Sequence, residues 1–190
     1  MSTLHPRRKV FKLTILGDGG VGKTSLRRRY LGEGFDSSYL ATIGADFATK
    51  KLDNEGTQVA QIWDLAGQPR FSVVREGYYR GTKGAIMVFD ISRPDTYYNI
   101  PKWIKEMMDS ITEDDPLPMV LVGNKADLRG SDMDFISQEQ AEEYASQLTQ
   151  WAHMDIPYIE SSAKTGLNVD EIFDSLVENI GIKEGTSFQG

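Results

Sequence analysis

A glycine-rich stretch near the N-terminus carries residues that can bind phosphate. It reads GDGGVGKTS from Gly17 to Ser25 and follows the apolar run LTIL. It matches the pattern G-x-x-x-x-G-K-[ST], in which backbone N–H groups face phosphate oxygens, the lysine contacts the β- and γ-phosphates and the hydroxyl binds Mg²⁺. A tight glycine turn with a solvated lysine is the alternative. The position between a strand pattern and a helix favours the phosphate site.

Four further segments follow in order along the chain: ATIG at 41–44, WDLAGQ at 63–68, NKAD at 124–127 and SSAKTG at 161–166. With the glycine-rich loop, they make the chain resemble a small GTPase of the Ras superfamily over roughly residues 9–180. Taken alone, NKAD is a plausible turn and SSAK a plausible loop, but five segments in register favour the resemblance. It implies a P-loop NTPase G domain that binds GTP and GDP.

The resemblance implies a guanine site built from several of these segments. Asp127 would accept hydrogen bonds from the N1–H and the exocyclic amine of guanine, whereas adenine would leave the buried carboxylate unpaired. Asn124 would brace the loops, and Ala163 would offer its N–H to the guanine O6. Lys125 and Lys164 would pack on the base. The full set implied for nucleotide binding is Gly17, Gly19, Gly20, Val21, Gly22, Lys23, Thr24, Ser25, Phe35, Tyr39, Thr42, Gly67, Asn124, Lys125, Asp127, Leu128, Ser162, Ala163 and Lys164.

The same resemblance implies a hydrolytic site with a metal ion. Gln68 is similar to the glutamine that orients the attacking water in related enzymes. Thr42 and Gly67 would contact the γ-phosphate, so that hydrolysis releases both loops. The catalytic set is therefore Gln68, Lys23, Thr42 and Gly67, and the Mg²⁺ set is Thr24, Thr42 and Asp64. Taken alone, Asp64 would be a turn residue and Thr42 an ordinary loop hydroxyl.

The arginines do not offer a catalytic finger within the chain. Gly19 stands where the superfamily needs a very small residue beside the glutamine and an incoming arginine. Arg70 and the run at 27–29 are interpreted as solvated faces. We therefore expect slow intrinsic turnover and an activating protein that accelerates it by roughly 10³–10⁵-fold, as arginine fingers do.

Within the superfamily, the resemblance is closest to the Rab branch, through WD-x-AGQ-x-RF at 63–71 and YYRG at 78–81. Leu65 and Pro69 depart from the usual threonine and glutamate. Because proline fixes φ and lacks an N–H, we expect a stiffer second switch region. Effectors, an exchange factor and an activating protein would bind the switch regions 34–50 and 68–80.

Three functions could use these motifs. A GTPase switch in membrane traffic or signalling is the leading one. A GTP-locked interaction module with little hydrolysis is favoured by Leu65 and Pro69 but opposed by Gly19, Thr42 and Gln68. A small-molecule kinase would leave NKAD unexplained.

Composition limits the partners and the location. The net charge of −7 over 190 residues argues against wholesale nucleic-acid binding. The chain contains no cysteine, which excludes disulfides, thiolate metal sites and a prenylated C-terminus in this sequence. Since Rab proteins ordinarily end in prenylated cysteines, either the C-terminus is truncated here or this is an unlipidated relative. We expect a cytoplasmic monomer without its own lipid anchor, recruited to membranes, if at all, through partners.

The elements that must position these residues alternate along the chain. Strand patterns occur at 11–15, 58–63, 85–89 and 119–122, and helical stripes begin near Ile100, Ala141 and Val169. With the resemblance, this predicts an α/β fold with an open, six-stranded, mostly parallel sheet and helices on both faces. The loops after Leu16, Trp63, Val122 and Ile159 should then meet at one edge of the sheet. A single G domain at 9–182 is expected, with flexible tails at 1–8 and 183–190.

Overall fold

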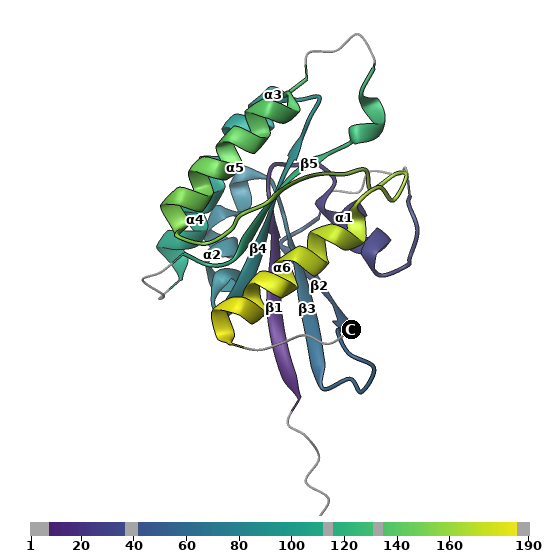
Figure 1. Cartoon of the computed structure of the whole chain (residues 1–190), viewed down its shortest axis with the longest axis vertical. Helices are drawn as coiled ribbons and strands as arrows, with labels where there is room; N and C mark the ends of the chain where they lie inside the picture. Colours follow the sequence, from purple (N-terminus) through teal and green to yellow (C-terminus); the bar gives the residue numbers. More distant parts are fainter. Residues whose placement is uncertain (1–7, 37–41, 112–115, 131–134, 186–190) are drawn as a thin grey trace, which may run out of the picture.

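A six-stranded sheet forms the centre of the molecule (Figure 1). The computed structural model describes residues 8–36, 42–111, 116–130 and 135–185. The strand order is β2-β3-β1-β4-β5-β6. β2 runs antiparallel to β3, and the other neighbouring strands are parallel, which confirms the predicted sheet. The strands are β1 Lys9–Leu16, β2 Ala45–Lys51, β3 Gln58–Leu65, β4 Thr82–Asp90, β5 Met119–Asn124 and β6 Tyr158–Glu160.

The central strands are apolar at nearly every position because both of their faces are covered. In β4, Ile86 and Val88 pack into one buried cluster, whereas Met87 and Phe89 pack into the other. Successive side chains of a strand point to opposite faces, so a strand buried on both sides requires a continuous apolar run. β2 lies at the edge of the sheet and is mostly exposed.

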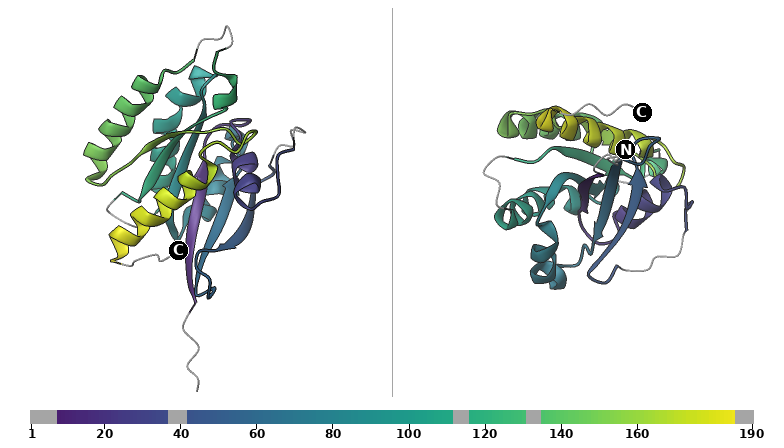
Figure 2. Two further views of the ribbon diagram at one scale, coloured as in Figure 1. Left: turned by 45° about the vertical axis from the view of Figure 1, so that its right-hand side comes forward. Right: turned by 90° about the horizontal axis from the view of Figure 1, so that it is seen from below.

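Helices cover both faces of this sheet, as Figure 2 shows from two directions. The helices are α1 Lys23–Tyr30, α2 Ser72–Tyr79, α3 Pro94–Tyr98, α4 Ile100–Ser110, α5 Gln138–Ala152 and α6 Val169–Glu184, with short 3₁₀ helices η1 Pro69–Phe71 and η2 Ala126–Leu128. Buried residues of α1 and α6 belong to one cluster, and those of α2, α4 and α5 belong to the other.

Local signals set several helix boundaries. Ser137 accepts the N–H of Gln140, and the Gln140 side chain accepts the N–H of Ser137, so α5 begins with a capping box. Pro101 stands in the first turn of α4, where its missing N–H costs little. α6 continues to Glu184, so the predicted start of the C-terminal tail at residue 183 is two residues too early. Among the described residues, no helix combines the length and apolar character needed to cross a membrane.

Candidate functional site

A cavity of about 400 Å³ lies beyond the carboxyl ends of the parallel strands. This volume falls in the range of small-molecule sites. Its walls come from all five segments that carry the resemblance. The predicted residues that line it are Gly19, Gly20, Gly22, Lys23, Thr24, Ser25, Phe35, Thr42, Gly67, Gln68, Asn124, Lys125, Asp127, Leu128, Ala163 and Lys164. The loops that were predicted to meet at this edge therefore do so.

At two positions of the loop between β1 and α1, only glycine fits for steric reasons. Gly17 and Gly22 have φ values of 138° and 102°, which L side chains rarely adopt. A Cβ atom at Gly17 would lie 2.0 Å from the Val88 oxygen, and one at Gly22 would lie 2.1 Å from Asn124 Nδ2. The loop therefore passes close to two other segments with its main chain. It leads into the N-terminus of α1, where unpaired N–H groups favour an anion.

Lys23, the first residue of α1, places a buried cation at this end of the cavity. Its Nζ atom donates to the backbone oxygens of Gly17 at 2.7 Å and of Asp18 at 2.8 Å. Only 6% of the residue is exposed, and burial lowers the pKa of Lys23 to about 8. A phosphate group at this position would place a negative charge beside the buried ammonium and so favour its charged form.

Three oxygen-bearing side chains converge beside Lys23. The Thr24 hydroxyl donates to Asp64 Oδ2, and the Thr42 hydroxyl lies 3.3 Å from the same atom and 3.1 Å from the Thr24 hydroxyl. Asp64 is fully buried, and its Oδ1 atom has no hydrogen-bond partner among the described residues. Burial raises the pKa of Asp64. An unpaired buried carboxylate oxygen beside two hydroxyls fits a hard cation such as Mg²⁺, which takes oxygen ligands.

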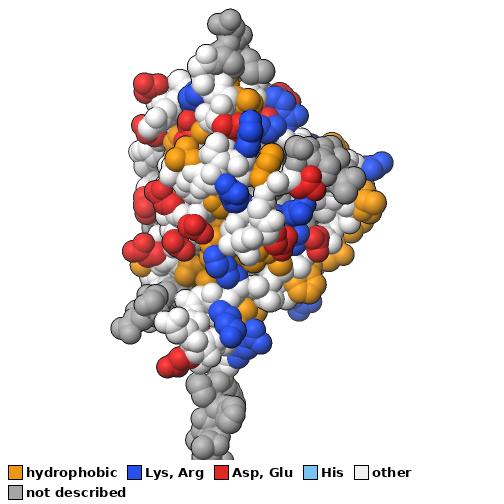
Figure 3. Space-filling view, turned by 90° about the vertical axis from the view of Figure 1, so that its right-hand side faces the viewer, with side chains coloured by type: hydrophobic (Ala, Val, Ile, Leu, Met, Phe, Trp, Pro, Cys, Tyr) orange, Lys and Arg blue, Asp and Glu red, His pale blue; other side chains and the backbone are white. Residues whose placement is uncertain are grey.

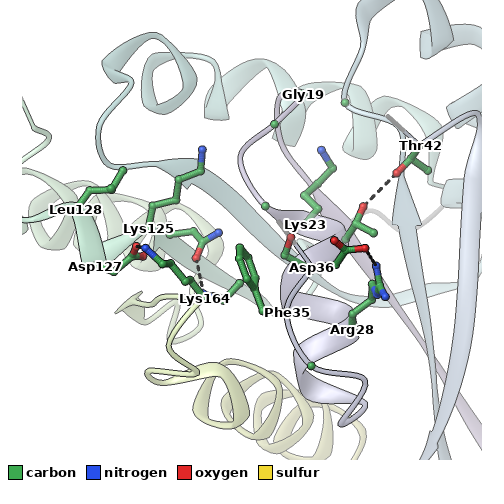
Figure 4. A pocket seen from close by; sticks show the side chains of 18 of the residues that line it. Gly19, Lys23, Arg28, Phe35, Asp36, Thr42, Lys125, Asp127, Leu128 and Lys164 are labelled. Atoms are coloured by element: carbon green, nitrogen blue, oxygen red, sulfur yellow. Dashed lines mark hydrogen bonds and ion pairs between the residues drawn. The ribbon is translucent and has the colours of Figure 1, made fainter. Parts of the chain in front are cut away.

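Asp127 lies at the opposite end of the cavity, near Lys125 and Lys164 (Figure 4). The Ser162 hydroxyl donates to Asp127 Oδ1 at 2.6 Å, and Lys164 Nζ lies 3.5 Å from Asp127 Oδ2. Asn124 Nδ2 donates to the Val21 oxygen at 2.8 Å, so Asn124 joins this end to the glycine-rich loop. The N–H of Ala163, which was expected at the guanine O6, donates to Asn124 Oδ1 at 3.2 Å.

Some predicted residues act behind the cavity wall. Gly17 supplies an acceptor to Lys23, and Val21 is buried in the core while its oxygen accepts from Asn124. Ser162 is fully buried and orients Asp127. Tyr39 lies outside the described residues.

Five residues of the site were missed by the sequence reasoning: Arg28, Gly34 and Asp36, which line the cavity, and Asp90 and Arg93, which lie beside it. Asp90, 1% exposed at the end of β4, pairs through Oδ2 with Lys125 Nζ at 2.6 Å. Arg93 lies 3.3 Å from the same carboxylate oxygen and donates to the Gly19 oxygen at 2.9 Å. A carboxylate at the end of a buried strand was a usable signal for Asp90. Arg93 follows in a loop, and its neighbours give no comparable signal.

The prediction for the arginine run is wrong at its first residue. Arg27 is only 7% exposed and pairs with Asp46 of β2 at 2.6 Å. Arg28 lines the cavity and pairs with Asp36 at 3.6 Å. Both arginines therefore pair with carboxylates of the chain. Arg70 is exposed, as predicted.

Comparisons with known proteins agree with this geometry. The sequence model described as Ras family matches residues 12–182. The chain is 38% identical over 182 residues to the Ras-related protein Rab7 of Pisum sativum, with 94% of this chain and 85% of the relative covered. It is also 38% identical over 177 residues to the Ras-related protein Rab-13 of Bos taurus, with 93% and 82% covered.

Proposed function

Because this chain belongs to the Ras family and is a Rab-like small GTPase, we propose that it binds GTP and GDP with Mg²⁺ and slowly hydrolyses GTP, acting as a switch in membrane traffic or signalling. The observation that supports this most directly is that one cavity has an end suited to phosphates and an opposite end suited to a base. Lys23 and the bare glycines suit phosphates at one end, and Asp127, held by Ser162, suits a base that presents two donors at the other.

The hydrolytic role rests on positioning. Gln68 lines the cavity beside Gly67, where it would orient a water molecule toward the terminal phosphate. Thr24, Thr42 and Asp64 would hold the Mg²⁺ ion, which would neutralise phosphate charge when bound. Lys23 would hold the phosphates, and its buried position keeps the ammonium among backbone oxygens.

An aromatic and aliphatic surface between the two switch regions suits protein partners. Phe47 stacks on Trp63 with ring centroids 4.8 Å apart, and Trp63 contacts Tyr78 at 5.4 Å. Ile43 and Val73 are 81% and 77% exposed. Figure 3, which faces the side that carries α1 and β2, shows exposed hydrophobic side chains along its right edge. Patches of this kind mark interaction sites, so effectors, an exchange factor and an activating protein would bind here.

The activating protein would supply a missing positive charge. Arg28 lines the cavity and Arg27 and Arg93 lie beside it, and each of the three is paired with a carboxylate of the chain. None of them is free to act as a finger at the terminal phosphate, so intrinsic turnover should be slow and a partner's arginine should accelerate it.

The test has two steps. Nucleotide released from the purified protein is identified by chromatography, and guanine nucleotides are expected. The variant Asp127→Asn should lose about 10²–10⁴-fold in affinity for GDP, because two hydrogen bonds to a charged group disappear, and it should gain affinity for xanthine nucleotides. The variant Asp155→Asn, in the loop before β6, is the matched control and should keep guanine preference. Unchanged GDP affinity in Asp127→Asn would refute the base assignment.

Hydrolysis separates the switch from a locked module. Phosphate release from the GTP-loaded protein in a single turnover over hours is the expected result. A GTP complex that persists without phosphate release would favour the interaction module, which binds GTP but scarcely hydrolyses it.

A further inference from the structure

Among the described residues, Arg75 of α2 is the most deeply buried arginine, and it does not line the cavity. It is 2% exposed. Its Nε and Nη2 atoms donate to the two carboxylate oxygens of Glu106 at 2.7 and 2.8 Å. Its Nη1 atom donates to the backbone oxygens of Ala66 at 2.8 Å and of Gln68 at 2.9 Å. One guanidinium therefore joins α4 to the loop that carries Gly67 and Gln68.

The partner of Arg75 is itself fixed. The Tyr79 hydroxyl donates to Glu106 Oε1 at 2.7 Å. The guanidinium carbon of Arg75 lies 4.4 Å from the centroid of the Trp103 ring, within cation–π range. The indole N–H of Trp103 donates to Asp18 Oδ1 at 2.8 Å, and Asn99 Nδ2 donates to Asp18 Oδ2 at 2.7 Å. The same helix, α4, thus contacts Arg75 and the phosphate loop.

The loop that Arg75 binds, which carries Gly67 and Gln68, packs closely against the backbone of the phosphate loop. A Cβ atom at Gly67 would lie 2.4 Å from the carbonyl carbon of Asp18 and 2.5 Å from the nitrogen of Gly19. Arg75 binds the carbonyls on both sides of Gly67, so it fixes the peptide units on either side of that contact. A lysine could not do the same, because only the planar fork of arginine reaches a carboxylate and two carbonyls together.

Building on the proposed function, we propose that Arg75 is a positioning residue for GTP hydrolysis, which holds Gly67 and Gln68 in place from behind without contacting the nucleotide. A displacement of about 1 Å in a reacting geometry can cost about 10²-fold in rate. Glu106, Tyr79 and Trp103 keep the guanidinium in place. Removing the fork should therefore slow hydrolysis and leave nucleotide affinity nearly unchanged.

The experiment compares Arg75→Gln and Arg75→Lys with the wild type in single-turnover GTP hydrolysis and in GDP binding. We expect the hydrolysis rate to fall about 10- to 100-fold in both variants, while the Kd for GDP changes less than about threefold, because only an arrangement used in hydrolysis is lost. The exposed Arg80 at the end of α2 gives the matched control, and Arg80→Gln should hydrolyse GTP at the wild-type rate.

Hydrogen–deuterium exchange gives a second readout that does not depend on catalysis. Amides between Ala66 and Ser72 should exchange faster in Arg75→Gln than in the wild type or in Arg80→Gln, because two anchored carbonyls are released. Equal hydrolysis rates, equal exchange, or a parallel loss of GDP affinity and rate would overturn the proposal. If the wild type itself released no phosphate, the proposed function would fail, and exchange would still decide whether Arg75 holds the loop.

Discussion

Two segments border the phosphate end of the cavity, and they differ in the contacts that hold them in place. The first, from Thr42 into β2, is held near the cavity by hydroxyl contacts of Thr42 and by the ion pair of Asp46 with Arg27. Ile43 between them is 81% exposed. The second, from Gly67 through α2, is held by buried Arg75 with four hydrogen bonds.

The two segments differ in how far their positions depend on what the cavity contains. Arg75 and Glu106, which anchor the second segment, do not line the cavity, so we expect their contacts to depend little on the bound nucleotide. The Thr42 hydroxyl contacts Thr24 and Asp64, the other two residues that would hold the metal, so its place depends on what the cavity contains. We therefore expect the first segment to report the nucleotide state more strongly than the second, whose order serves hydrolysis.

The largest effect should come from forcing the second segment off the phosphate loop. In Gly67→Ala, the new methyl group would meet the backbone of Asp18 and Gly19 at 2.4 to 2.6 Å. Since backbone cannot yield as a side chain can, single-turnover hydrolysis should fall about 10²-fold or more. Gly77→Ala, in α2 of the same segment, is the control, because a Cβ there meets nothing within 4 Å. Hydrolysis by Gly67→Ala at the wild-type rate would contradict the close seating.

An intermediate effect is expected from the first segment. Thr42→Ala removes the hydroxyl that lies near Thr24 and Asp64, so the Mg²⁺ concentration that slows GTP release by half should rise about 10-fold, as loss of one charge-assisted contact predicts. GDP release should change much less. Thr42→Ser keeps the hydroxyl and should behave as the wild type. Equal effects on GTP and GDP would mean that this segment does not distinguish the two states.

The smallest effect concerns pH and the anchor of the second segment. Burial alone would raise the pKa of Glu106, but the hydrogen bonds from Arg75 and Tyr79 and the charge of Arg75 lower it below its ordinary value of 4.5. A lowered carboxylate pKa stabilises the fold above the ordinary value and loses that stabilisation as the pH falls through the folded value. Glu106→Gln should therefore cost about 1 kcal/mol in free energy of unfolding at pH 7.

That cost should shrink as the pH falls below 4.5, where the wild-type carboxylate becomes protonated. Urea denaturation at several pH values measures it. Glu76→Gln, on the exposed side of α2, controls for the change in net charge. A cost that stays constant down to low pH would show that Glu106 does not act as a carboxylate here.

The sequence predicted the parts of the fold and site that depend on local patterns. Continuous apolar runs indicated β4 and β5 because both of their faces are buried, and the glycine-rich loop was recognised because only bare backbone fits there. β2 has no such run: it is an edge strand whose residues are mostly exposed. β6 is three residues long, too short for a periodic signal.

Pairs between distant elements could not be predicted in this way. Arg75 and Glu106 are 31 positions apart, and neither residue's neighbours indicate the other. Arg27 belongs to a run of three arginines that looks like a solvated face. It is buried in α1 and pairs with Asp46 of β2, a contact that no residue near Arg27 signals.

The stacked rings of Phe47, Trp63 and Tyr78 have a practical consequence. Trp63 belongs to β3, while its two ring neighbours come from β2 and α2, so one indole touches an element of each switch region. The other two tryptophans sit elsewhere, Trp103 buried beneath Arg75 and Trp151 on the outer side of α5. The protein thus contains its own fluorophore where its two switch regions meet, and replacing Trp103 and Trp151 would leave a single tryptophan there to report nucleotide exchange without an attached dye.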